Sequence, residues 1–225
     1  MTAPTTSQPP PITLRLPSKY RDTTTSSSSS SSGGSPTPSF TPPTLDFLHR
    51  TWTVTHSTLR MWRSARNVRI TYGPLPPSSK SRARLSDLVE YESLSDRSGG
   101  RGVRRVAGVD TATSAGDTSV WDWRGSGWLF FVGSHWEVLG WGEREVPGGN
   151  GEGEKERWVV TWFAPTVFTA EGLDVYSDRR EGGSEGLVRE VLAELGRVTE
   201  GKGKLGEMVR RDMSAVAVQL PWKEA

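Results

Sequence analysis

Residues 119–141 read SVWDWRGSGWLFFVGSHWEVLGW and hold five of the ten tryptophans of the chain. The order Trp-Asp-Trp, Arg-Gly-Ser-Gly, Trp-Leu-Phe-Phe-Val predicts a strand, a tight turn and a second strand, and HWEVLGWG adds a third segment. Large aromatic side chains on paired strands suit a half-buried, pleated surface. The stretch therefore predicts the centre of a β-barrel whose inner wall is rich in tryptophan.

Short strand patterns flank this stretch on both sides. Apolar residues alternate or run together in TWTVTHS (51–57), NVRITY (67–72), LSDLVEYES (85–93), GVRRVAGVDTAT (102–113) and RWVVTWF (157–163). A helical period appears only from residue 184, continues after a Gly-Lys-Gly break, and precedes a closing strand at 214–220. Because strands do not alternate with helices, we expect a mainly β protein: a single antiparallel up-and-down β-barrel of 8–10 strands with one C-terminal helix. Closure would also remove the edges of these apolar strands.

The composition divides the chain and narrows the classes of function. Residues 1–43 are rich in serine and proline and predict a disordered tail, either a spacer or a partner-docking segment, ahead of one barrel domain over 44–225. The 28 basic residues nearly balance the 26 acidic ones, so no strong field favours nucleic acid. No apolar run reaches the roughly 18 residues of a membrane span.

The chain has no cysteine, which excludes disulfides and thiolate metal sites. This absence suits a reducing compartment, and we expect a cytoplasmic protein. The Ser/Thr-rich start with few acids leaves a mitochondrial transit peptide as an alternative. The sequence predicts no oligomeric state.

A short apolar turn followed by Arg50-Thr51-Trp52-Thr53-Val54 resembles the start of the first strand in the calycins, the group of lipocalins, fatty-acid-binding proteins and nitrobindins. In that group, a tryptophan just inside the first strand packs across the closed end of the barrel. The strings WTVTHSTLRMWRSARNVRITYGPL, VAGVDT, WDWRGSGWLFFVGSHWEVLGWG and WVVTWFAPTVFTAEGLDVYS resemble uncharacterised fungal lipocalin-like proteins. The resemblance implies a calycin-like barrel with a possible apolar cavity and no known activity. Haem binding would need a histidine at the barrel end, which the resemblance does not place, and we expect no cofactor.

The motif His135-Trp136-Glu137 supplies candidate catalytic residues. In a strand, His135 and Glu137 share one face and Trp136 lies on the other. An inward pair would act as an acid–base couple with shifted pKa values, whereas an outward pair would be an ordinary solvated one. Asp122 and Arg124 alternate with tryptophans in the same way and leave the same choice between a ligand anchor and a salt bridge.

Candidate ligand-binding residues are the aromatic side chains of the strands and the polar groups beside them. Both faces of a strand cannot line one cavity, so some of this set must lie outside it. Metal binding is not expected, because the three histidines, at 49, 56 and 135, have no ligand spacing. The set is His56, Trp62, Arg66, Tyr72, Trp121, Trp123, Arg124, Trp136, Trp141 and Trp162.

Three functions fit these patterns. The first is binding of a small apolar or aromatic molecule inside a tryptophan-rich barrel, which can hold one ligand. The second is a cofactor-free isomerase, cyclase or dehydratase that uses an inward His135–Glu137 pair. The third is a structural barrel filled by its own tryptophans, which would contain no space larger than a few water molecules.

Overall fold

The computed structural model of the protein describes residues 10–21, 40–95, 102–146 and 154–224. Among these residues, no helix is long and apolar enough to cross a bilayer. The elements, in chain order, are η1 (Ser18–Tyr20), α1 (Leu45–Leu48), β1 (Thr51–Ser57), η3 (Arg60–Ser64), β2 (Ala65–Leu75), β3 (Arg84–Ser93), β4 (Arg104–Ala112), β5 (Val120–Gly125), η4 (Gly127–Leu129), β6 (Gly133–Glu145), β7 (Lys155–Phe163), β8 (Gly172–Ser177), α2 (Glu185–Thr199), α3 (Lys204–Asp212) and β9 (Ser214–Ala215).

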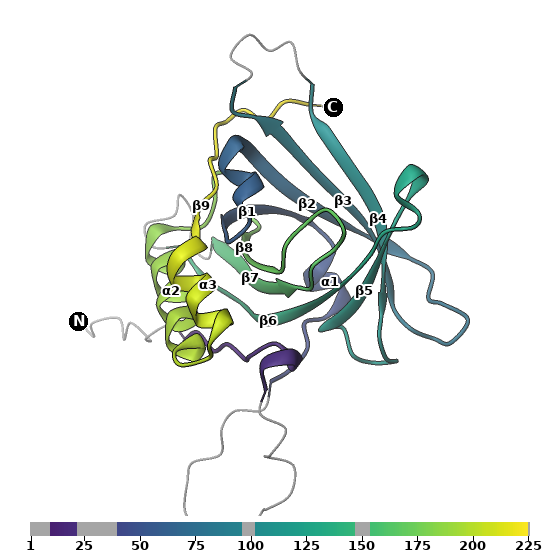
Figure 1. Ribbon diagram of the computed structural model, residues 1–225, viewed down its shortest axis with the longest axis horizontal. Helices are drawn as coiled ribbons and strands as arrows, with labels where there is room; N and C mark the ends of the chain where they lie inside the picture. Colours follow the sequence, from purple (N-terminus) through teal and green to yellow (C-terminus); the bar gives the residue numbers. More distant parts are fainter. Residues whose placement is uncertain (1–9, 22–39, 96–101, 147–153, 225) are drawn as a thin grey trace, which may run out of the picture.

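Strands β1 to β8 form a closed antiparallel barrel (Figure 1). From β2 to β8 each strand pairs with the next one along the chain, and β1 closes the ring by pairing with both β8 and β2. The predicted up-and-down barrel is therefore confirmed, with eight strands in the ring. The predicted closing strand is shorter than expected, because β9 has two residues beside β1 and continues only as a bridge between Ala217 and Arg66.

The barrel has an apolar layer on each side of its wall. The inner layer includes Val54, Tyr72 and Trp136, while the outer layer joins β7 and β8 to the helices through residues such as Trp162 and Leu195. Figure 1 shows α2 and α3 side by side on the outside of the barrel. The predicted helical region is present as these two helices, divided at residues 200–203. Strand β7 is buried on both faces, as its sequence predicts.

One end of the barrel is closed by the turn that precedes β1. Trp52 is completely buried, and its indole donates a hydrogen bond to the Leu48 carbonyl oxygen at 3.1 Å. Phe47 packs on Trp52 with ring centroids 5.6 Å apart, and the Arg50 guanidinium lies over both rings. Thr44 caps α1 by accepting a hydrogen bond from the Phe47 N–H. The tryptophan plug implied by the resemblance to calycins is thus present.

The predicted strand WLFFV is wrong. Residues 126–132 form a turn that contains η4, and Gly127 in this turn has a φ of +62°, a value that glycine adopts without steric cost. The Leu129 N–H donates to the Ser126 carbonyl, and β6 begins only at Gly133. The apolar residues of this segment have the composition of a strand, but Trp128, Phe130 and Phe131 are exposed at the open end of the barrel, and only Leu129 and Val132 are buried.

Part of the predicted tail packs on the barrel. We call residues 10–21 the N-terminal strap. Its Leu14 is buried in the outer apolar layer, and the Arg15 N–H donates to the Leu139 carbonyl of β6 at 2.8 Å. The prediction of a disordered tail is therefore wrong for this segment, because Ile12, Leu14 and Leu16 supply the apolar area that a polar tail lacks. Residues 1–9 and 22–39 of the predicted tail lie outside the described residues.

Candidate functional site

The barrel encloses a cavity of about 630 Å³. Its walls come from β2 to β8 and from the two turns η3 and η4. Aliphatic and aromatic groups dominate the lining, with Ile70, Val89 and Val106 among the former. Because the opposite end is closed by Trp52, the cavity has a floor on that side and a mouth on the other.

Exposed apolar side chains surround the mouth. Met61 of η3, Trp128 of η4 and Phe168 of the β7–β8 loop line the cavity and also face solvent, with Trp128 75% exposed. Phe130 and Phe131 extend the exposed apolar surface next to Trp128. A molecule that enters the cavity therefore first meets aromatic and thioether groups.

Four of the predicted ligand-binding residues line the cavity: Trp62, Tyr72, Trp123 and Trp136. Tyr72 and Trp136 are stacked, with ring centroids 5.6 Å apart and planes 10° apart. Trp121 does not line the cavity but stacks on Trp136 at 5.7 Å. The three rings form a continuous aromatic wall, in which Tyr72 and Trp136 offer apolar surface to a ligand and Trp121 packs against Trp136.

Two buried aspartates lie on the inner face beside this wall. Asp87 of β3 pairs with Tyr72 of β2, and Asp110 of β4 is two residues along from the partner of Asp87, so the carboxyls are diagonal neighbours on one face. Trp136 donates its indole N–H to Asp110 Oδ1 at 2.7 Å. Burial raises the pKa of both carboxyls, and the charge of Asp87 raises the pKa of Asp110 further. We call Asp87 and Asp110 the carboxyl pair.

Gly108 makes room for the contact between Trp123 and the carboxyl pair. A Cβ atom at position 108 would lie 2.2 Å from Trp123 Nε1, so any larger residue would displace the indole. Gly108 is the β4 partner of Asp87, and the Trp123 indole crosses it to hydrogen-bond the Asp87 carboxyl, which partly offsets the rise in the pKa of Asp87. Two indole N–H groups thus serve the carboxyl pair, one for each aspartate.

A third buried carboxyl lies on the β8 wall. Asp174 lines the cavity, is only 4% exposed, and accepts a hydrogen bond from the Ser57 hydroxyl at 2.5 Å. Burial raises the pKa of Asp174 to about 7, and the Ser57 hydrogen bond lowers it only in part. Tyr176, on the same face of β8, has a raised pKa through burial and the nearby charge of Asp174. The cavity therefore combines aromatic walls with two lining carboxyls, Asp87 and Asp174, and Asp110 lies next to Asp87. Burial favours the neutral form of all three.

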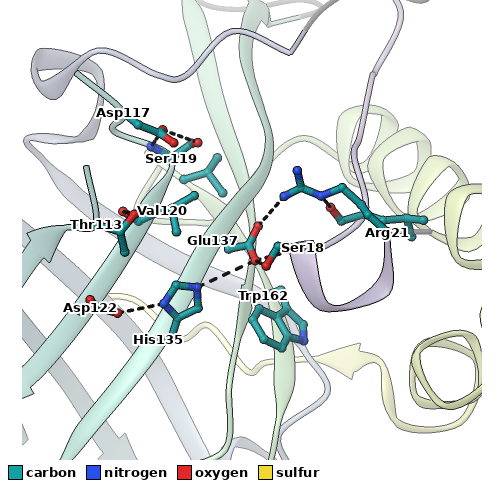
Figure 2. Close-up of polar contacts among 12 residues, drawn as sticks. Ser18, Arg21, Thr113, Asp117, Ser119, Val120, Asp122, His135, Glu137 and Trp162 are labelled. Carbon is teal, nitrogen blue, oxygen red and sulfur yellow. Dashed lines mark hydrogen bonds and ion pairs between the residues drawn. The ribbon is translucent and has the colours of Figure 1, made fainter. Parts of the chain in front are cut away.

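The predicted catalytic pair lies on the outer face of β6. Figure 2 shows the Glu137 carboxylate between Ser18 and Arg21 of the N-terminal strap. Glu137 accepts hydrogen bonds from the Ser18 N–H and the Arg21 guanidinium, both at 2.9 Å, and is completely buried by them. His135 bonds Asp122 at 2.9 Å and lies 3.9 Å from Glu137. The inward orientation is wrong, because Trp136 takes the inner face and its two neighbours must take the outer one.

Three further predicted residues also lie outside the cavity. A β-bulge between Val54 and His56 turns His56 away from the inner face that Val54 occupies. Arg66 binds Glu92 on the outside of the barrel at 3.0 Å. Arg124 lies on the outer face of β5, because Trp121 and Trp123 of the same strand point inward, and it therefore cannot anchor a ligand in the cavity.

Two predicted tryptophans contribute to other parts of the fold. Trp141 packs on Phe47 at the closed end, with ring centroids 4.6 Å apart. Trp162 is on the outer face of β7 and donates its indole N–H to Glu171 at 3.0 Å. Neither of them lines the cavity.

Sequence reasoning missed the three aspartates and Tyr176. A signal was present in β3, because Asp87 occupies the apolar phase of Leu85-Ser-Asp-Leu-Val89 rather than the polar phase. Asp174 gives no such signal, because it alternates with the apolar Leu173 and Val175 and shares its phase with Tyr176. An acid on the apolar phase of a strand indicates a carboxyl that faces the interior.

Within the described residues, no three histidine or acidic side chains are arranged to hold a metal ion. No protein-family model and no curated protein matches the chain. Among solved structures, apocrustacyanin C2 is similar with a TM-score of 0.45 and 8% identity, over 77% of this chain and 79% of that one. Lobster apocrustacyanin A1 is similar with a TM-score of 0.43 and 8% identity, over 78% of this chain and 79% of that one. The siderocalin Ex-FABP is similar with a TM-score of 0.44 and 13% identity, over 78% of this chain and 96% of that one. At these TM-scores, the likenesses carry no argument about ligand or family.

Proposed function

We propose that the protein binds one small, largely apolar molecule with aromatic character inside its barrel. The cavity is the observation that supports this proposal. Its volume of about 630 Å³ is within the roughly 300–1,000 Å³ that is usual for small-molecule sites. Its mouth is open, and its lining consists mainly of apolar and aromatic side chains with few polar groups, which is the composition such sites use.

The two alternatives are less well supported. A barrel filled by its own side chains would leave room for a few waters, at about 30 Å³ each, whereas this cavity is some twenty times larger than one water. An isomerase that uses His135 and Glu137 would need the pair beside the substrate. The two side chains are on the opposite side of the barrel wall from the cavity, and Glu137 is occupied by the N-terminal strap.

Two expectations from the sequence stay predictions. Location in the cytoplasm rests on cysteine usage alone. Similarity to fungal lipocalin-like proteins rests on the quoted strings.

The proposal is tested with Nile red, a neutral dye whose fluorescence rises in an apolar site. Val89 lines the cavity from β3, and its neighbour Leu88 faces outward on the same strand. We expect Val89→Trp to fill the cavity and weaken dye binding at least tenfold, whereas Leu88→Trp leaves it unchanged. Equal affinity for both variants and the parent protein would place the dye on the surface and contradict the proposal.

A further inference from the structure

We propose that the ligand carries a protonated amine, which the carboxyl pair receives while the aromatic wall holds the rest of the molecule. This inference rests on the proposed function, because it names the chemical class of the molecule that the cavity binds. Asp87 lines the cavity, and Asp110 lies directly behind it on the neighbouring strand. A ligand that reaches the Tyr72–Trp136 stack is therefore next to the carboxyl pair.

The carboxyl pair has no cationic partner in the part of the chain that the structure describes. Two other buried acids have an arginine partner: Glu92 pairs with Arg66 at 3.0 Å, and Glu137 with an arginine of the strap at 2.9 Å. Asp174 and Glu156 instead accept hydrogen bonds from the hydroxyls of Ser57 and Ser184. Ionising a buried carboxyl that has no cationic partner costs several kcal/mol. A ligand that supplies the missing positive charge would remove this cost, so the unpaired acids favour a cation over a neutral or anionic molecule.

The carboxyl pair also has unused hydrogen-bonding capacity. One oxygen of each carboxyl, Asp87 Oδ1 and Asp110 Oδ2, is buried and accepts no hydrogen bond in the structure. Asp87 is only 9% exposed and Asp110 is completely buried. An ammonium group has three N–H donors and no acceptor, which matches two free carboxylate oxygens. The Tyr72 and Trp136 rings, which line the cavity beside the pair, offer apolar surface to the rest of the ligand.

The pH dependence of binding follows from the groups around the pair. The titratable groups nearby are Tyr72 of β2 and Asp174 and Tyr176 of β8, and burial raises the pKa of each of them. The positively charged groups that line the cavity are Arg104 and Arg105 of β4.

Because burial raises the pKa of both members of the pair, the unliganded protein keeps a proton there at a pH where an ordinary aspartate is ionised. An ammonium requires the ionised form. Its affinity therefore rises with pH until the carboxylate forms by itself, and binding below that point releases a proton.

Tryptamine and tryptophol test the inference on the full chain. They share an indole and an ethyl arm and differ only in the terminal ammonium or hydroxyl group. Titration calorimetry from pH 6 to pH 8 is expected to show at least tenfold tighter binding of tryptamine at pH 8, with an affinity that falls toward pH 6. Repeating the titration in buffers with different ionisation enthalpies measures the proton released, which tryptophol binding should lack.

Asp87→Asn is the decisive variant, and Asp122→Asn on the outer face of β5 is its control. We expect Asp87→Asn to remove the preference for tryptamine and its pH dependence while tryptophol affinity changes less than threefold. The control should leave the affinity for both compounds unchanged. If Asp87→Asn does not fold, Asp110→Asn replaces it with the same expectation.

The outcomes separate this inference from the proposed function. Equal affinity for the two compounds at every pH, or tighter binding of tryptophol, would overturn the amine while the cavity remains a binding site. Binding of Nile red without binding of either indole would also count against the amine. Failure of Nile red to distinguish Val89→Trp from Leu88→Trp would instead remove the proposed function itself.

Discussion

Replacing Asp174 by asparagine should stabilise the protein above neutral pH, although it removes a hydrogen-bonded side chain from the interior. Burial raises the pKa of Asp174 from 3.8 to about 7 in the folded state. Between these two values, the folded protein keeps a proton that the unfolded chain has released, so stability falls as pH rises. At about 1.4 kcal/mol per pH unit, the loss amounts to about 4 kcal/mol, and it is complete above pH 7.

The pH dependence of the difference between variant and parent isolates this effect. About 2.5 kcal/mol of the loss falls between pH 5 and pH 8, because part of it has already occurred below pH 5. The amide side chain in Asp174→Asn does not ionise, and its carbonyl oxygen can still accept the Ser57 hydroxyl. Burying the new amide costs about 1–3 kcal/mol at every pH and so leaves the slope unchanged.

The assay is urea unfolding of both proteins at pH 5, 6, 7 and 8, followed by tryptophan fluorescence and circular dichroism. We expect the stability of Asp174→Asn relative to the parent protein to rise by about 2.5 kcal/mol from pH 5 to pH 8. Glu145→Gln, at an exposed position of β6, is the control variant. A difference that stays constant with pH, or that falls toward pH 8, would refute the assignment of a neutral Asp174 in the folded protein.

Two other predictions concern the packing of the inner wall and of the strap. Gly108→Ala would place a methyl group against the Trp123 indole and should lower the free energy of unfolding in urea by about 1–3 kcal/mol. The control Gly102→Ala, whose new methyl group meets no atom within 4 Å, should lower it far less. Equal losses in the two variants would contradict the role of Gly108. Glu137→Gln removes the charge that holds the strap and should speed amide hydrogen exchange over residues 10–21. The free energy of unfolding should fall by about 1–3 kcal/mol. Unchanged exchange in residues 10–21 would mean that apolar contacts alone hold the strap.

The barrel itself could be predicted because its signals are local. Alternating residues such as Trp52 and Val54, short spacings and the absence of strand–helix alternation all favour one antiparallel sheet, and ring closure follows from the need to protect its edges. The WLFFV segment has the composition of a strand and is therefore predicted as one, although Trp128, Phe130 and Phe131 are exposed in a turn. The turn predicted at Arg-Gly-Ser-Gly does not end at Gly127 but continues to residue 132, and the apolar pattern does not reveal this extension.

The orientation of the site could not be predicted because β6 is apolar on both faces. Trp136 packs against the cavity, while Leu139 on the other face packs under the strap and the helices. Because both faces of β6 are apolar, the alternation of apolar and polar residues does not show which face is the inner one. The inward orientation expected for the His135–Glu137 pair is wrong for this reason. Knowledge that the strap covers β6 would have resolved the choice, but this contact joins residues more than 100 positions apart.

Ring closure also sets the earliest time at which the protein can fold during synthesis. Strand β1 leaves the ribosome early, yet one of its two partners is β8, and Thr55 meets Val175 across 120 residues of chain. At roughly 5–20 residues per second, β8 is made about 6–24 s later. Throughout this interval β1 lacks its β8 partner and the ring has no closed wall, so the tryptophan-rich strands cannot be buried as in the finished barrel until β8 has been made.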